Sequence, residues 1–175
     1  MPTYRSNSLT IEEQEALFKA ASSFEDLTLF KLALNTGIRR EDIVRIELSN
    51  IHLKRQELSF WEAKKKRVWV VPLTATLTKE LERYINTLPK GQKKLFDFSG
   101  KTAYNKLQRT LTRAGITKTI SFHDLRRSLM KTGKRKGLDQ KAICQITGDS
   151  MRTVEQFYQN FDMDELKEEI KKLET

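Results

Sequence analysis

The chain has 175 residues, a formal net charge of +10 and a pI of about 9.7. Its mean hydropathy is −0.60, no apolar run approaches the ~20 residues that span a bilayer, and "MPTYRSNSLTIEEQ" lacks the apolar stretch of a signal peptide. The only cysteine, Cys144, excludes an internal disulfide framework and a cysteine-based metal site. These features predict one soluble, intracellular domain with no cysteine-based metal site and no membrane partner.

The N-terminal part of the chain predicts helices. "SNSLTIEEQEALFKAA" (6–21) contains the capping box T-I-E-E. "FEDLTLFKLALNTG" (24–37) ends at Gly37, since a glycine commonly closes a helix. "REDIVRI" (40–46) is a short third helix.

The spacing of apolar residues then changes to the alternation that is typical of β-strands. Phe60, Trp61 and Trp69 are expected in the core of a small antiparallel sheet, and Pro72 stops its last strand. The predicted strands are "NIHL" (50–53), "ELSFW" (57–61) and "RVWVV" (67–71), with "EAKKK" as the hairpin between the last two.

Helices return after the sheet and continue to the end of the chain. The expected helices cover residues 74–88, 101–115, from His123 to about Gly133–Gly137, 139–148, 150–160 and 162–174. The fold class is therefore mainly α with a small three-stranded antiparallel β-sheet (α+β). Residues 1–175 form a single domain with a C-terminal tail helix at about 162–174.

Positive charge is concentrated in two segments. Residues 101–136 carry eleven Lys or Arg and one acid, and residues 51–67 carry six and two. The tail, 159–175, is acidic, with three Lys and six acids. Localised basic segments are typical of proteins that bind the nucleic-acid backbone, so a nucleic acid is the expected partner.

Several cations occupy positions that favour anion binding. Arg39 follows a helix-ending glycine, and Lys64 lies in the predicted hairpin. His123 and Arg126 lie one turn apart at a helix N-terminus, where N–H groups are free and the dipole favours anions. Each also has an ordinary explanation: an ion pair with a nearby acid for Arg39, a solvated charge for Lys64 and a capping role for His123.

The order of four motifs is more specific than any one of them. "NTGIRRED", "AKKKRVWVVPL", "HDLRRS" and "ITGDSMRTVEQFY" resemble, in this order, the catalytic domain of tyrosine recombinases, the phage-type integrases and Xer-like enzymes. "TGIR" followed by Asp42 resembles the first arginine box, and Lys64 lies eight residues before Pro72 like the family's hairpin lysine. "HDLRRS" resembles the H-x-x-R box, and Tyr158 lies at the nucleophile's distance from "TGDS".

The resemblance implies the tyrosine recombinase catalytic-domain fold and a site-specific recombinase or integrase that needs no cofactor, metal or ATP. It also implies double-stranded DNA as the partner and a DNA-associated protein in the cytoplasm. Tyr158 would attack the scissile phosphate and form a 3′-phosphotyrosyl link with a free 5′-hydroxyl. Arg39 and Arg126 would bind the non-bridging oxygens through bidentate donors. Lys64 would protonate the departing 5′-oxygen, and His123 would take the tyrosine proton or hydrogen-bond the phosphate.

Other basic residues are expected to hold the flanking DNA backbone. Lys106, Arg109 and Arg113 share one side of a predicted helix. The remaining candidates are Lys65, Lys66, Arg67, Arg127, Lys131, Lys134, Arg135 and Lys136.

The chain departs from the family pattern in two respects. Asp149 stands where the family usually has His or Trp, and an ionised carboxylate repels phosphate. Asp149 either orients Arg126 or His123, lies outside the site, or makes the enzyme slow. The N-terminal core-binding domain of the family is also expected to be absent, so that the chain is either a trimmed piece or works without that half.

Alternative functions remain open. A catalytically weak or inactive relative that binds DNA as a regulator is suggested by Asp149, and a type IB topoisomerase shares the chemistry. Tyr84 is expected in the core, and Tyr104 lies on the basic helix. Self-association into a dimer or tetramer on DNA is expected through the C-terminal helix, with a docking face formed by Phe161, Leu166, Ile170 and Leu173.

Overall fold

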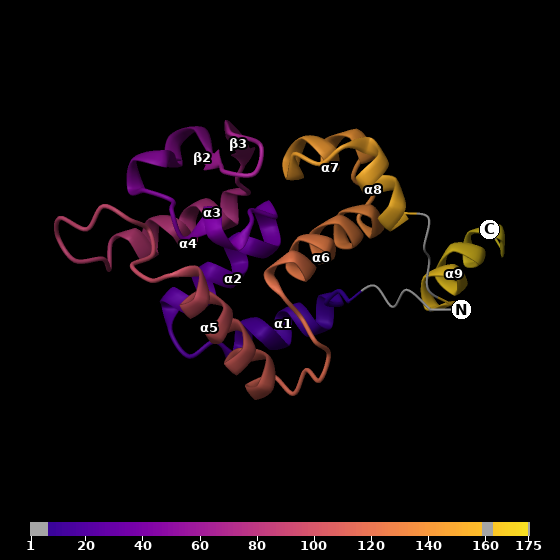
Figure 1. Ribbon diagram of the computed structural model, residues 1–175. Helices are drawn as coiled ribbons and strands as arrows, with labels where there is room; N and C mark the ends of the chain where they lie inside the picture. Colours follow the sequence, from indigo (N-terminus) through magenta and orange to yellow (C-terminus); the bar gives the residue numbers. More distant parts are fainter. Residues whose placement is uncertain (1–6, 159–162, 175) are drawn as a thin grey trace.

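The computed structural model describes residues 7–158 and 163–174, and Figure 1 labels its main elements. The first part contains α1 (Ile11–Ala20), α2 (Phe24–Thr36), α3 (Arg40–Ile43), β1 (Ile51–His52), β2 (Glu57–Glu62) and β3 (Arg67–Pro72). The second part contains α4 (Ala75–Ile85), α5 (Gly100–Arg113), α6 (Phe122–Arg135), α7 (Gln140–Thr147), α8 (Met151–Tyr158) and α9 (Met163–Ile170). Short 3-10 helices lie at Leu48–Asn50, Leu53–Arg55 and Lys171–Glu174.

Side-chain caps determine where several helices begin. The Thr10 hydroxyl accepts the Glu13 N–H and the Glu13 carboxylate accepts the Thr10 N–H, so the predicted capping box is confirmed. Ser121 and Asp124 form a second capping box at the start of α6. Two of the N–H groups that the sequence analysis left open to an anion there are therefore satisfied within the chain.

The sheet has the predicted topology. β2 lies between β1 and β3 and pairs antiparallel with both. The register places Phe60 opposite Trp69 and Trp61 opposite Val68. Phe60 is 7% exposed, and Trp61 is 52% exposed because neighbours on a strand point to opposite faces. The prediction that Trp61 lies in the core was therefore wrong, whereas that for Phe60 is confirmed.

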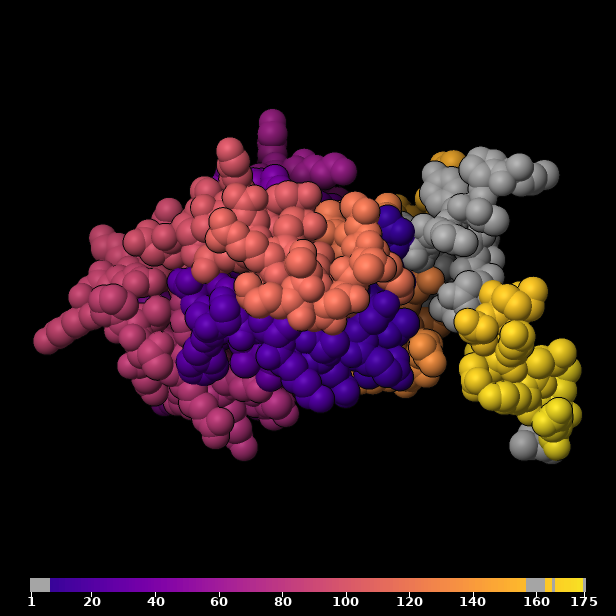
Figure 2. Space-filling model, turned by 90° about the horizontal axis from the view of Figure 1, so that it is seen from below, coloured from indigo at the N-terminus to yellow at the C-terminus, as the bar shows by residue number. Residues whose placement is uncertain are grey.

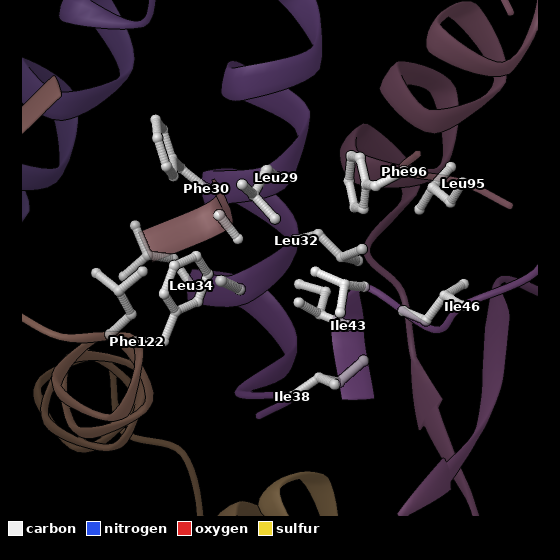
Figure 3. Close-up of a cluster of buried hydrophobic side chains, with 14 of the residues drawn as sticks. Leu29, Phe30, Leu32, Leu34, Ile38, Ile43, Ile46, Leu95, Phe96 and Phe122 are labelled. Carbon is white, nitrogen blue, oxygen red and sulfur yellow. The ribbon is translucent and has the colours of Figure 1, made fainter. Parts of the chain in front are cut away.

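Helix α2 lies at the centre of the main core. Leu29, Phe30 and Leu32 are fully buried, and Figure 3 shows them between Phe122 of α6 on one side and Ile43 of α3 on the other. Burial of each such side chain contributes about 1.5–3 kcal/mol. This packing holds the C-terminal end of α2 against α6. It therefore brings the motif "NTGIRRED", at the end of α2, close to the motif "HDLRRS", at the start of α6.

Tyr84 belongs to the core, as predicted. Its ring is 3% exposed, and its hydroxyl donates to the Leu95 carbonyl oxygen at 3.2 Å. This tyrosine is therefore unavailable as a nucleophile.

A smaller apolar cluster holds the last helices of the domain. Met130 of α6, Ile143 of α7 and Val154 of α8 are buried against one another. This cluster places the start of α8 and the turn before it beside α6. In Figure 1, α7 also lies next to β3, with which it is in contact.

Helices α1 and α5 pack together on the side of the molecule away from the sheet (Figures 1 and 2). Two predicted elements are shorter than expected, since the first strand is limited to Ile51–His52 and the third helix to Arg40–Ile43. Among the described residues, no helix combines the length and apolar character that a membrane crossing requires.

Candidate active site

Arg126 lies at the centre of the candidate site, between the ends of two helices. Its side chain is 4% exposed. Nη1 donates at 2.6 Å to the carbonyl oxygen of Gly37, the residue that follows α2. Nη2 donates to the carbonyl oxygen of Thr147, the last residue of α7. Helix C-termini carry partial negative charge, so both ends attract the guanidinium.

The two helix ends have the same local structure, which the sequence encodes as two Thr-Gly pairs. Gly37 and Gly148 adopt left-handed conformations, with φ of 66° and 71°. The hydroxyls of Thr36 and Thr147 each donate to the carbonyl oxygen four residues earlier. A Cβ on Gly37 would lie 3.3 Å from Cγ of Arg126, so the glycine also lets α6 approach closely.

Asp149 follows this second turn and binds Arg126. Its carboxylate accepts from Nε at 3.0 Å and lies 2.8 Å from Nη2, while Nη2 of Arg39 lies 3.8 Å away. Burial alone would raise the pKa of Asp149. The hydrogen bond and charge of Arg126, then the charges of Arg39 and Lys65, lower this pKa below its usual value.

Arg39 is the second arginine of the site, and a buried carboxylate holds it. Nη1 of Arg39 lies 2.5 Å from Glu62, which also accepts from Nε of Arg67 at 2.7 Å. The Glu62 side chain is 1% exposed. Burial favours a raised pKa for Glu62, but the hydrogen bonds from Arg67 and Arg39 outweigh it and the pKa lies below the usual value.

The β2–β3 hairpin closes the site against the turn before α8. Lys65 Nζ donates to the carbonyl oxygen of Gly148, and Nη2 of Arg67 does so at 3.3 Å. The Arg67 guanidinium lies 3.8 Å above the Trp69 ring. At the base of the hairpin, the Ala63 N–H donates to buried Asp42, whose pKa is raised by burial.

His123 lies at the exposed edge of the site, in the first turn of α6. Partial desolvation, followed by the charges of Arg127 and Arg126, lowers the pKa of this imidazole below its usual value. The ring is therefore neutral near pH 7 and can accept a proton.

Two predicted catalytic residues, Lys64 and Tyr158, are less fully described by the structure than the two arginines. Lys64 is exposed in the hairpin turn, one residue before the lysine that contacts Gly148. Tyr158 is the last residue of α8, but its side chain lies outside the described part of the structure, as does that of Phe157. Phe161, predicted in the docking face, also lies outside the described residues.

The basic stripe of α5 is partly used within the chain. Lys106 lies 2.7 Å from Asp26, and Nε of Arg113 donates to the carbonyl oxygen of Ala20 at 3.0 Å. Arg109 is exposed. That Lys106, Arg109 and Arg113 bind DNA stays a prediction. Of the three, exposed Arg109 is best placed to contact the DNA backbone.

The other basic candidates lie on the hairpin and along α6. Arg67 faces the interior of the site, whereas Lys66 is exposed on the turn. Arg127 pairs with Asp124 at 2.9 Å. A groove shared with residues 8–11 and α9 is lined by Lys131, Lys134 and Arg135, and Lys136 is exposed beside it.

Glu62 is absent from the residues predicted for the site, and Arg67 is among the predicted DNA contacts rather than the residues that build the site. The signal for Glu62 was present, because it continues the inward-facing series of Leu58 and Phe60 along β2. A carboxylate on the buried face of a strand requires a cation, and only the fold reveals that Arg39 and Arg67 supply it. Among the described residues, no cluster of His, Cys, Asp or Glu is suited to a metal ion.

Residues 7–165 match the family model described as the phage integrase family. The chain belongs to this family. Among curated relatives, it is 23% identical over 181 residues to tyrosine recombinase XerA of Pyrococcus horikoshii, a match that covers 98% of this chain and 63% of XerA. The chain thus spans less than two thirds of that relative's length.

Solved structures of family members have the same fold. The crystal structure of XerA recombinase superposes with a TM-score of 0.83 at 22% identity, covering 96% of this chain and 65% of XerA. XerH site-specific recombinase, bound to palindromic difH substrate in a post-cleavage complex, gives 0.78 at 19% identity, covering 97% and 53%. The fold class predicted from the motifs, a helical recombinase catalytic domain with a small sheet, is confirmed.

Proposed function

We propose that residues 1–175 form the catalytic domain of a site-specific DNA recombinase or integrase, which cleaves and rejoins strands through a 3′-phosphotyrosyl link at Tyr158. The observation that carries the proposal is the convergence of Arg39 and Arg126 on one anion, the Asp149 carboxylate. Two guanidinium groups that meet at one point are suited to the oxygens of a phosphate. The post-cleavage DNA complex of XerH supports DNA as the substrate.

The reaction follows from these groups. The Tyr158 oxygen attacks phosphorus, the bond from phosphorus to the 5′-oxygen breaks, and negative charge builds on the non-bridging oxygens. Arg39 and Arg126 stabilise that charge, each by about 3–4 kcal/mol, as donors in an oxyanion hole do. Neutral His123 takes the tyrosine proton. Attack of the 5′-hydroxyl on the phosphotyrosine reverses the steps, so no cofactor is consumed.

Covalent trapping on DNA tests the nucleophile. The protein is incubated with nicked duplexes that lose the 5′-hydroxyl fragment after cleavage, and a denaturing gel reveals any protein–DNA adduct. Tyr158→Phe should abolish the adduct, because no other group supplies the bridging oxygen. Tyr104→Phe, a change at a tyrosine exposed on α5, should leave it intact. Equal adducts from both variants would exclude Tyr158.

The departing 5′-oxygen needs a proton, and the hairpin offers two lysines for it. The family motif assigns this role to Lys64, whereas Lys65 is engaged with Gly148. We expect Lys64→Ala to lose cleavage of ordinary DNA but not of DNA with a 5′-bridging sulfur, because a thiolate leaves without a proton. Lys65→Ala is the matched control. If the 5′-bridging sulfur instead restored cleavage by Lys65→Ala, Lys65 rather than Lys64 would be the residue that protonates the 5′-oxygen.

DNA binding without catalysis is the alternative function. It is favoured by the contact between Asp149 and Arg126, which occupies a phosphate-binding group. Intact DNA binding without an adduct, also after fusion to a core-binding domain, would establish this alternative.

Assembly and location are part of the same proposal. The tail helix presents apolar side chains to solvent, with Leu166 46% and Ile170 61% exposed. A second copy bound on DNA would cover them, so the protein acts as a dimer or tetramer, DNA-associated in the cytoplasm.

A further inference from the structure

The donors of Arg126 are almost fully used. A guanidinium has five N–H groups. The Nε–H donates to Asp149, one Nη2–H donates to the Thr147 carbonyl oxygen and one Nη1–H donates to the Gly37 carbonyl oxygen. Nη2 also lies 2.8 Å from the other oxygen of Asp149 in an ion pair. Within the described part of the chain, at most one N–H of Nη1 is left for another acceptor. Arg126 therefore cannot bind a phosphate in a bidentate manner in this state.

Asp149 holds the edge of Arg126 that a phosphate would use. Its two oxygens lie 3.0 and 2.8 Å from Nε and Nη2, which is the paired geometry of a guanidinium with any oxyanion. Arg39 approaches the same carboxylate at 3.8 Å, and Lys65 lies near enough to lower its pKa. The carboxylate thus has the cationic surroundings of a bound phosphate.

A purely supporting role for Asp149 explains less. The Gly37 and Thr147 carbonyl oxygens already fix the guanidinium from two sides, and Arg126 is almost fully buried. The remaining Nε–Nη2 edge is the one that faces the partly exposed Asp149, whose side chain is 12% exposed. Two anions on this edge would repel each other.

We propose that Asp149 is a built-in competitor of DNA, which occupies the phosphate position and must be displaced before Arg126 and Arg39 can bind the scissile phosphate together. The inference rests on the proposed function, because it takes the two arginines as the phosphate-binding groups. Asp149 lies in the turn between α7 and α8, where rotation of its side chain would free this edge of Arg126.

Affinity for DNA tests the proposal without any need for cleavage. Asp149→Asn keeps the size of the side chain and one acceptor oxygen but removes the charge. Glu15→Gln, at an exposed position on α1, changes the net charge by the same amount. We expect Asp149→Asn to bind a labelled nicked duplex about tenfold more tightly than the wild type in fluorescence anisotropy, and Glu15→Gln less than twofold. Equal or weaker binding by Asp149→Asn overturns the proposal.

A measurement on the wild type covers the case in which the variant does not fold. NMR follows the Arg126 Nε–H and the Asp149 carboxyl carbon while the nicked duplex is added. Displacement moves both signals together. An Arg126 signal that stays, or that moves while the Asp149 signal does not, overturns the proposal. Loss of the adduct in Tyr158→Phe tests the proposed function separately, so a protein that binds phosphate by displacement but never cleaves is recognised as such.

Discussion

Glu62 is the residue on which the arginine arrangement depends. It is buried between Arg39 and Arg67, and its removal leaves two guanidinium groups without their shared anion. Because both arginines keep partial contact with water, the expected loss is below that of a fully buried pair.

We expect Glu62→Gln to lower the free energy of unfolding by about 2 kcal/mol at pH 7, measured by urea denaturation. Glu57→Gln is the matched control on the same strand, since Glu57 pairs with Arg55 at 3.4 Å in an exposed position. The control should cost less than about 0.5 kcal/mol. Similar losses in both variants would show that Glu62 is not the anchor of Arg39.

The acid side of the stability profile follows from the same carboxylates. The pKa values of Glu62 and Asp149 are lowered in the folded state from ordinary values of 4.5 and 3.8. As pH falls below about 4.5, the unfolded chain therefore binds more protons than the folded one, and the free energy of unfolding decreases. Urea denaturation between pH 5 and pH 3 should show a shallower decline in Glu62→Gln, and an unchanged slope would contradict it.

His123 permits a direct test of the electrostatics. Its pKa lies below 6.5, and the charge of Arg127 is the second cause after desolvation. Arg127→Gln should raise the pKa of His123, followed by NMR of its ring. Lys19→Gln, a charge change on the exposed side of α1, should leave it in place. A pKa that does not respond to Arg127→Gln would leave desolvation and the charge of Arg126 as the causes of the shift.

At the scale of elements, the hairpin and the turn before α8 are positioned by close contact. A Cβ on Gly148 would lie 2.9 Å from Nη2 of Arg67 and 3.5 Å from the Trp69 ring. Gly115 has the same φ of +71°, but nothing lies within 4 Å of its Cβ position. A comparison of alanine substitutions at Gly115 and Gly148 therefore separates the cost of backbone strain from the cost of displacing the hairpin.

Gly115→Ala should cost about 1 kcal/mol, which is the strain of a left-handed alanine. Gly148→Ala should cost about 1–2 kcal/mol more, because Arg67 must move from Glu62. Urea denaturation measures both. Equal costs would mean that the hairpin tolerates the extra methyl group.

Elements were predicted well where the pattern is local. The helix ends at Gly37 and Gly148 and the hairpin between β2 and β3 follow from turn chemistry and period. Arg39 and Arg126 could be proposed from their motifs, and contact of Asp149 with Arg126 was one of the alternatives, but Glu62 and the two carbonyl oxygens were not foreseen. Glu62, Asp149 and the two carbonyl oxygens meet only after distant segments pack, and no local pattern encodes that contact.

At the scale of the molecule, the tail helix α9 exposes apolar side chains that the domain does not cover. Leu166 and Ile170 make no large buried contact, so Leu166→Ala with Ile170→Ala should change the melting temperature little. Under the proposed self-association, the double variant should form fewer dimers and tetramers on DNA in analytical ultracentrifugation. Lys167→Ala, at a charged position of the same helix, is the control. A large drop in melting temperature would mean that α9 packs as part of the domain.

The position of Arg126 between two distant helix ends also bears on folding. Its contact with Gly37 joins residues 89 positions apart in sequence, and that with Thr147 joins residues 21 apart. Such non-local contacts form only after large loops have closed, which makes them late events for a chain leaving the ribosome. A nascent or partly unfolded copy therefore has basic segments that can touch DNA but no assembled pair of arginines. Under the proposed function, strand cleavage therefore requires a folded molecule, because only the completed fold brings Arg39 and Arg126 together at one anion.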